Sequence, residues 1–191
     1  FDSREREASG WLARFESAQE GIDRDLVIAT LRGQLLMAGW PAWRRDPSVY
    51  LNPVFAGLLL PFLHRLRPEP ELVDGVVDRL AEVPGVLASC RDNLKPELSA
   101  PRLVRRALRQ AAAGPAFLSD SLPAEVGDPA LRARIQHAAA PAVQAFEDLS
   151  SFLTGFAERA TGDWRMGETL YSGILEQQEL LGYGAGELHR R

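Results

Sequence analysis

Apolar positions along this chain recur at intervals of three and four residues, and no segment alternates apolar and polar side chains with a period of two. Intervals of three and four place apolar side chains on one face of an α-helix, whereas alternation is typical of a half-buried strand. The first stripe, over residues 3–20, consists of Ala8, Trp11, Leu12, Phe15 and Ala18. We therefore expect an all-α protein.

The same spacing, interrupted by prolines and glycines, predicts the other helices. Proline lacks a backbone donor and glycine favours the conformations that close a helix, so both residue types mark helix ends. The remaining helices are expected over residues 24–38, 53–66, 71–82, 85–94, 100–112, 116–121, 128–160 and 167–181. The fold predicted is an irregular multi-helix array of about eight or nine helices, with short loops punctuated by proline and glycine.

Several of these boundaries depend on proline. Residues 40–53 contain three prolines and predict an ordered loop, with the Asn-Pro pair at 52–53 opening the next helix. The Pro-Gly pair at 84–85 predicts a joint between two helices. Pro141 lies inside the longest pattern and predicts a kink or a break near residues 137–140.

The size of the chain fits a folded domain of ordinary composition. It has 191 residues, of which 46% are hydrophobic and 25% charged. Such a length can form one sizeable core or two small ones, and the apolar stripes run through both halves. We expect a single helical domain over residues 1–191. Because the chain begins with Phe1 and its last residues, GELHRR, resemble the start of a helix, we expect it to be the N-terminal part of a longer protein.

Charge and hydropathy exclude two classes of partner. The formal net charge is -4 and there is no basic run, which argues against binding to nucleic acid through its phosphates. The most apolar stretch, residues 54–63, contains Pro61 and is far shorter than the roughly 20 residues that span a bilayer. The single cysteine is compatible with a cytoplasmic location, which we expect.

The residues that usually carry metal or nucleophilic chemistry are scattered. His64, His137 and His189 lie far apart in the sequence and form no His-Glu-x-x-His pair. Cys90 lies on the apolar side of its predicted helix, which favours a small core residue over a catalytic thiol in an accessible, electropositive site. We therefore assign no catalytic residue and no metal ligand to this chain.

Two further clusters leave alternatives open. One face of the helix expected over residues 100–112 is either a solvated surface or a site for a carboxylate or phosphate, and it carries Arg102, Arg105, Arg106 and Arg109. The proline-rich loop contains aromatic rings that either wall a ligand pocket or pack on one another, and these are Trp40, Trp43 and Tyr50.

Three segments carry motifs in a fixed order: WRRDPSVY at 43–50, RLAEVPGVLASCRDNL at 79–94 and ATGDWRMGETLY at 160–171. They resemble, in turn, the Trp…Arg-Asp-Pro…Tyr, Arg…Ile-Pro…Leu…Ala…Asn-Leu and Gly-Asp-Phe-Arg-Leu-Gly…Tyr stretches of the bacterial domain-of-unknown-function 885 family. The chain departs from that pattern with Val83 before the proline and Cys90 in place of alanine. The resemblance extends over about residues 43–190.

The resemblance implies a mainly helical protein similar to helical zinc peptidases. Members of the family are much longer, and their His-Glu-x-x-Pro-Gly-His-His motif, in the later half, has no match here. The resemblance thus implies an N-terminal helical region that shapes or covers a substrate groove, with zinc bound outside this chain and no activity of this chain alone. Its partners would be the remainder of its own polypeptide or a partner surface, and a peptide substrate.

Within the matching motifs, we nominate Asn93, Arg165 and Tyr171 as substrate-contact candidates. Arg165 can pair with a peptide carboxylate, and the other two side chains can hydrogen-bond a peptide backbone. In a structural alternative, Arg165 fixes a turn and Asn93 caps a helix end.

The alternative function is a stand-alone helical binding or interaction module without catalysis. It predicts a closed core, whereas the first function predicts an apolar surface or groove left bare.

Overall fold

The computed structural model describes residues 2–19 and 21–191. The protein is 78% helical, the described residues form no strand, and joining the shortest segments to their neighbours gives eight helices. The all-α array of about eight or nine helices that the sequence predicts is therefore confirmed.

The helical segments follow one another with short connections. Their bounds are α1 (Asp2–Glu16), α2 (Ile22–Ala38), α3 (Ala42–Arg45), α4 (Ser48–His64), α5 (Glu69–Asn93), α6 (Pro101–Ala116), the π-helical turn η1 (Phe117–Ser121), α7 (Leu122–Ala124), α8 (Pro129–Arg159), α9 (Glu168–Gln177) and α10 (Ala185–Leu188). The chain forms two compact units: a central unit, Ala42–Trp164, and a terminal unit made of the residues up to Pro41 together with Arg165–Arg191. The single domain expected from the sequence stays a prediction.

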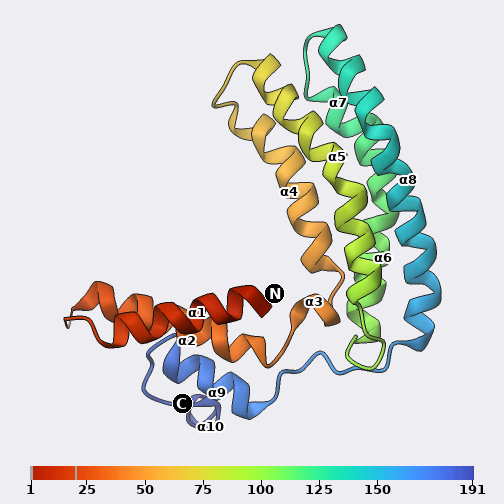
Figure 1. Ribbon diagram of the computed structural model, residues 1–191. Coiled ribbons are helices and arrows are strands. Elements are labelled where there is room, and N and C mark those ends of the chain that lie inside the picture. Colours follow the sequence, from red (N-terminus) through yellow and green to blue (C-terminus); the bar gives the residue numbers. More distant parts are fainter. Residues whose placement is uncertain (1, 20) are drawn as a thin grey trace. The chain divides into compact units, whose positions relative to one another are not determined.

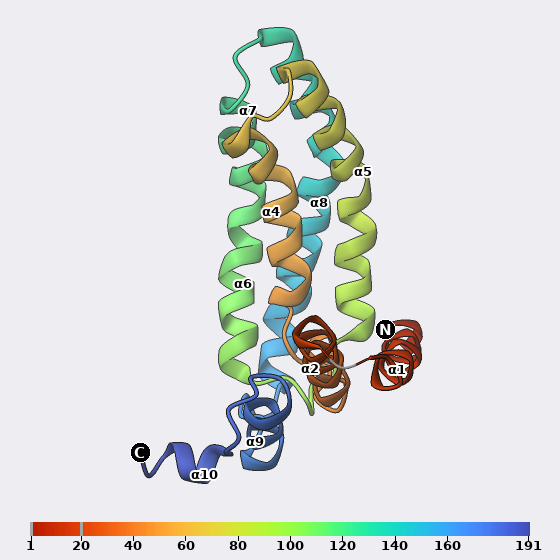
Figure 2. The ribbon, with the colours of Figure 1, turned by 90° about the vertical axis from the view of Figure 1, so that its left-hand side faces the viewer.

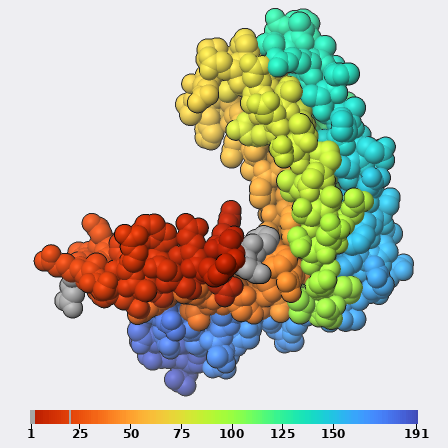
Figure 3. Space-filling view, in the orientation of Figure 1, coloured from red at the N-terminus to blue at the C-terminus, as the bar shows by residue number. Residues whose placement is uncertain are grey.

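The central unit is a helical bundle in which α4, α5, α6 and α8 run side by side, each antiparallel to the one before it in the chain (Figures 1 and 2). Short connections impose this antiparallel order. Large apolar side chains fill the interior, and the following are at most 1% exposed: Leu58, Phe62, Leu80, Leu87, Phe146 and Leu153. In the space-filling view, the atoms of α5 and α8 pack closely along the side of this unit (Figure 3).

The start of α4 corrects the predicted loop over residues 40–53. Residues 42–45 form α3, and α4 begins at Ser48, so that Pro53 lies inside the helix and does not open it. The side chain of Asp46 accepts a hydrogen bond from the backbone N–H of Ser48 at 2.9 Å, which satisfies one of the free donors at the helix start. The carboxylate of Asp46 thus supplies a start signal six residues before the Asn-Pro pair at 52–53.

Prolines inside α5 and α8 also fail to end those helices. The joint predicted at the 84–85 pair is wrong, because α5 continues through Pro84. The helix α8 likewise runs through Pro141 without a break. A proline removes one ladder hydrogen bond, but buried side chains on both sides of Pro84, Val83 and Leu87, keep the helix against the core.

Two helix ends also differ from the prediction. The helix α6 continues past residue 112 to Ala116 and then passes into η1 and α7, where the sequence predicts a separate turn over 116–121. The helix α9 ends at Gln177 and not at residue 181. The start of α8 agrees with the sequence, since the carboxylate of Asp128 accepts from the N–H groups of Ala130 and Leu131 at 2.7 and 3.0 Å.

The terminal unit is a smaller helical assembly. Within it α1 packs on α2, α2 on α9, and α9 on α10. The hydroxyl of Ser172 accepts from the N–H of Ala185 at 2.9 Å and so joins the start of α10 to α9. A Cβ at Gly184 would come within 2.8 Å of the Ser172 hydroxyl, so this close approach requires glycine.

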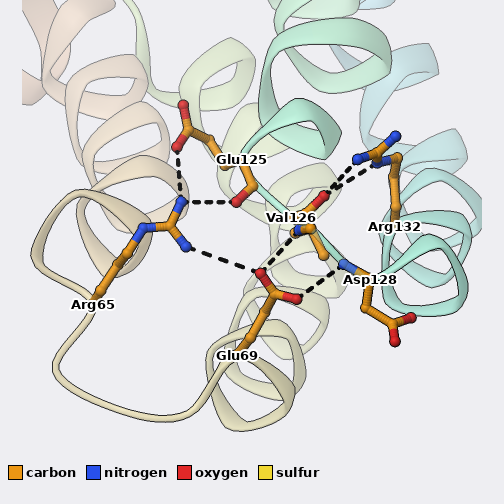
Figure 4. Close-up of polar contacts among 7 residues, drawn as sticks. Arg65, Glu69, Glu125, Val126, Asp128 and Arg132 are labelled. Carbon is orange, nitrogen blue, oxygen red and sulfur yellow. Dashed lines mark hydrogen bonds and ion pairs between the residues drawn. The ribbon is translucent and has the colours of Figure 1, made fainter.

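A polar clamp fixes one end of the central unit (Figure 4). The carboxylate of Glu69, at the start of α5, accepts from the backbone N–H groups of Gly127 and Asp128 at 2.9 and 3.1 Å. Those two hydrogen bonds lower the pKa of Glu69. Arg65 donates to the carbonyl of Glu125 at 2.9 Å. The clamp therefore ties the α4–α5 connection to the segment that leads into α8.

Candidate functional site

The helix α4 is apolar on all sides, but only part of it is buried. It carries no charged residue from Ser48 to Phe62. Its inner side, with Leu51, Leu58 and Phe62, lies in the core. Its outer side and the turn after it present an outer leucine row that is 45%, 60% and 86% exposed, in the order Leu60, Leu63 and Leu66. A helix that is hydrophobic all round is normally buried all round, so this row is an uncovered surface of the central unit.

Beside this row, two depressions follow the seam between α4 and α5, which lie next to each other in Figure 2. One has a volume of about 470 Å³ and includes Leu60 and Leu72 in its lining. The other has a volume of about 200 Å³ and is lined mainly by apolar side chains, including Val83 and Val86. Both depressions share Gly57 and Arg79, and we call them together the α4–α5 groove.

Arg79 lies in the middle of the α4–α5 groove. Its Nη1 donates to the carbonyl of Gly75, one turn earlier in α5, at 2.7 Å. A Cβ at Gly57 would lie 3.7 Å from Arg79 Cδ, and a Cβ at Gly75 would lie 3.1 Å from Nη1. Among the described residues Arg79 forms no ion pair. Arg67 also lines the larger depression. The groove therefore combines apolar walls with two guanidinium groups, and the one that both depressions share, that of Arg79, has no carboxylate partner among the described residues.

The motif at 43–50 has a structural role at the opposite end of α4. Asp46 accepts from Arg106 at 2.8 Å, and the same guanidinium donates to the hydroxyl of Ser48 at 3.2 Å. The side chain of Asp46 is only 16% exposed, so this ion pair is partly shielded from water. The pair ties α6 to the start of α4.

A second member of the four-arginine face is also engaged. The guanidinium of Arg102 lies over the ring of Trp164 at 5.0 Å from its centroid, in the geometry of a cation–π contact. With Arg106 bound to Asp46, two of the four arginines make specific contacts within the central unit. The solvated-surface alternative therefore describes only the remaining two, Arg105 and Arg109.

Asn93, one of the three nominated residues, lies at the end of α5, where it hydrogen-bonds the phenol of Tyr50. The Tyr50 hydroxyl donates to the carbonyl of Trp43 at 3.0 Å. Burial raises the pKa of Tyr50, the hydrogen bond from Asn93 opposes that rise, and the charge of Cys90 adds to it. The amide of Asn93 thus joins the ends of α5 and α4, and its role as a substrate contact stays a prediction.

Cys90 is a core residue with no exposed surface. Burial, and to a lesser extent the charge of Asp46, raises the pKa of its thiol to about 12, while Arg91 opposes the rise. The thiolate form that a nucleophile needs is therefore disfavoured near neutral pH. The structural interpretation of Cys90 is confirmed.

The other two nominated residues belong to the terminal unit. Tyr171 lies on α9, is 42% exposed and lines an open depression of about 680 Å³ together with Glu168 and His189. Arg165 lies in the segment between α8 and α9 and is exposed, and it is not among the residues that line this depression. The structure gives Tyr171 a concave setting, and the roles of both residues stay predictions.

Sequence reasoning missed the α4–α5 groove and Arg79. The signal was present in the leucines of α4, because Leu60 and Leu63 fall on the side opposite Leu58 and Phe62 at 100° per residue. The sequence does not show that Arg79 on α5 lies next to Gly57 on α4, because this contact depends on how the two helices pack.

The part of the chain that the structure describes contains no group of three or more His, Cys, Asp or Glu side chains arranged to bind a metal ion. None of the helices in residues 2–19 and 21–191 is both long and apolar enough to cross a membrane.

The comparisons with known proteins agree with the motifs. The family model described as "bacterial protein of unknown function (DUF885)" matches residues 1–191. That match includes the segments 43–50, 79–94 and 160–171, on which the resemblance was based. No curated protein and no solved structure matches the chain.

Proposed function

The chain belongs to the DUF885 family of bacterial proteins, and we propose that it is the helical, substrate-side region of a hydrolase that resembles zinc-dependent peptidases. In this proposal the region shapes or covers a substrate groove. The family's His-Glu-x-x-Pro-Gly-His-His motif, which this chain lacks, supplies the zinc site in a catalytic part. The zinc ion would polarise a water molecule for attack on a peptide bond.

The observation that carries the proposal is the outer leucine row of α4. Complete burial of one leucine side chain contributes about 1.5–3 kcal/mol, so three exposed leucines in a row favour association with another surface. Leu63 and Leu66 are 60% and 86% exposed, although the first lies in the last turn of a well-packed helix and the second just after it. We propose that the catalytic part, in the remainder of the polypeptide, covers this row.

The substrate would be a peptide, with contacts from the terminal unit. Tyr171 supports this idea because it combines an exposed phenol with a depression of about 680 Å³. Arg165 offers an exposed guanidinium for a peptide carboxylate. Asn93 supports it least, since its amide hydrogen-bonds Tyr50.

A mixing experiment tests the proposal. Residues 1–191 alone are expected to bind no stoichiometric zinc and to hydrolyse no fluorogenic peptide. Addition of a purified catalytic part carrying the zinc motif should give a complex by light scattering and should increase its peptide hydrolysis. Leu63→Glu should abolish the complex, because a carboxylate would be buried in an apolar contact, whereas Arg109→Glu on α6 should not. Hydrolysis by residues 1–191 alone, or a complex insensitive to Leu63→Glu, would contradict the proposal.

The second candidate is a stand-alone helical binding module. The closed core of the central unit favours it, since Leu80, Leu87 and Phe146 are at most 1% exposed without any further chain. A module of this kind would remain a soluble monomer and would not associate with the catalytic part. The light-scattering arm of the same experiment therefore separates the two functions.

A further inference from the structure

We propose that the α4–α5 groove binds one amphipathic helix of the catalytic part, and that this helix carries an acidic side chain between two apolar anchors. The inference rests on the proposed function, because it specifies the chemistry of the segment that docks beside the outer leucine row. Helices that insert into apolar grooves commonly place their anchors at intervals of three and four residues.

The apolar anchors are indicated by the two depressions of the groove. The larger, about 470 Å³, offers apolar walls from Leu60, Pro61 and Leu72. The smaller, about 200 Å³, offers walls from Val83 and Val86. Because the two volumes lie along one seam on either side of Arg79, a single helix can place one side chain in each. Two depressions that share Gly57 and Arg79 favour a continuous segment over two separate ligands.

The acidic side chain is indicated by Arg79. Its guanidinium has five N–H donors, and Nη1 donates to the carbonyl of Gly75. A carboxylate is the complementary group, since it accepts two parallel hydrogen bonds from a guanidinium fork. Glu71 and Glu82 also line the groove, one in each depression, and Arg67 lines the larger depression together with Glu71. Because Arg79 is the charged residue that both depressions share, the complementary carboxylate belongs at the centre, between the two apolar anchors.

Glycines provide the room for a close approach. Gly57 lies under the Arg79 side chain, and a Cβ there would make ordinary contact with Arg79 Cδ at 3.7 Å. A leucine at this position should therefore be accepted by α4, where leucine is a better helix former than glycine, while its side chain fills the groove. Gly57→Leu is thus a variant that blocks the groove and leaves the outer leucine row intact.

Peptide selection tests this inference directly. A phage-displayed library of random 16-residue peptides is selected on residues 1–191, and enriched peptides are measured by titration calorimetry. We expect enriched peptides to carry Asp or Glu between apolar residues three or four positions away on each side. Replacement of that acid by its amide should weaken binding about tenfold, as for loss of a charged hydrogen bond.

Variants of the chain separate the groove from other surfaces. Arg79→Glu should weaken the acidic peptides about tenfold and enrich peptides with Lys or Arg at the central position. Gly57→Leu should abolish binding, and Arg109→Glu should leave it unchanged. Circular dichroism of each variant checks that the helices remain.

Two outcomes would overturn the inference: enriched peptides that lack the central acid, or peptide binding that is unaffected by Arg79→Glu and Gly57→Leu. Failure of the proposed function can be distinguished from failure of this inference, because in the first case the wild-type chain does not associate with the catalytic part at all. If Arg79→Glu and Gly57→Leu both leave that association intact while Leu63→Glu abolishes it, the proposed function stands and this inference fails.

Discussion

The central and terminal units have the same helical spacing of apolar residues and yet differ in how deeply they bury them. In the central unit, Phe146, Leu149 and Leu153 on α8 have no exposed surface. In the terminal unit the buried hydrophobic residues are Ala8, Ile28, Ala29 and Leu175, and larger ones remain exposed, including Trp11, Ile22 and Leu26.

The difference follows from the number of neighbours available to each helix. The helix α8 packs against both α5 and α6, whereas α1 packs mainly on α2. A stripe of apolar residues predicts that one face of a helix packs against another element, but complete burial of its side chains requires neighbours on more than one side. We therefore expect most of the folding stability of the chain to reside in the central unit.

The largest effect expected is that of Phe146→Ala. Phe146 is fully buried, contacts the ring of Phe55 at a centroid distance of 5.4 Å, and should leave a cavity when truncated. The free energy of unfolding should fall by about 3–5 kcal/mol, measured by urea titration of the far-ultraviolet circular dichroism. Trp11→Ala is the counterpart in the terminal unit, where the ring is 42% exposed, and should cost less than about 1 kcal/mol. Equal losses of unfolding free energy in Phe146→Ala and Trp11→Ala would contradict the difference in burial between the two units.

A matched pair of glycines gives the next largest effect. A Cβ added at Gly114 of α6 or at Gly33 of α2 would overlap a neighbouring side chain. At Gly114 the neighbour is the buried ring of Phe146, which cannot move aside, so Gly114→Ala should cost about 1–3 kcal/mol. At Gly33 the neighbour is the flexible end of Gln178, so Gly33→Ala should change stability by less than about 1 kcal/mol. Native-state hydrogen exchange of each unit checks both values, and a larger loss for Gly33→Ala would contradict the prediction.

Acid sensitivity should distinguish the Glu69 clamp from a surface ion pair. Hydrogen bonds from Gly127 and Asp128 lower the pKa of Glu69 below its ordinary value of 4.5. Its contribution to stability is therefore full above about pH 4.5 and is lost as the pH falls through the lowered pKa. Glu69→Gln should lower the urea midpoint at pH 7, and the difference from wild type should shrink in acid.

The control for that prediction is Glu16→Gln in the terminal unit, where Glu16 pairs with Arg32 at 2.8 Å with both side chains more than 40% exposed. An exposed pair contributes little, so its urea midpoint should stay close to that of wild type at every pH. If the effect of Glu69→Gln did not change with pH, the ionised carboxylate of Glu69 would not be what stabilises the clamp.

The smallest effect is expected on the rate of thiol labelling, which is measured on the unsubstituted chain. Cys90 is the one cysteine of the chain, lies in the central unit and has a pKa of about 12. At pH 8 the thiol is protonated and buried, so an aromatic disulfide reagent should react only when the central unit opens. The labelling rate measured by absorbance should therefore fall with stabilising solutes. Reaction at the rate of a free thiol would show that the core around α5 is accessible.

Much of the fold could be predicted from the sequence because helical periodicity is a local property. The spacing of apolar residues located α1, α2, α6 and α8 to within a few residues. Proline was misjudged at residues 53 and 84 because its local cost was weighed without the tertiary packing that offsets it. At residue 141 the break does not form, and the kink stays a prediction.

The candidate site was less predictable, since it depends on residues that are distant in sequence. The bond between Asp46 and Arg106 joins positions sixty residues apart, and Arg79 meets Gly57 only through the packing of two helices. The pattern of a single sequence shows the residue types but does not show which distant residues come into contact in the fold. The motif residue Asn93 was found, but its partner Tyr50 was not foreseen.

The π-helical turn η1 determines how the bundle responds to the deletion of a residue. Its five residues, Phe117–Ser121, lie between α6 and α7. Leu118 within the turn and Leu122 directly after it are both fully buried. A π-bulge accommodates one residue more than the α-helical path needs. Deleting Ser119 should therefore let an ordinary α-helical turn form while Leu122 and the helix downstream keep their phase about the helix axis. This short stretch is thus the place where the bundle should tolerate the loss of one residue with the least change in its packing.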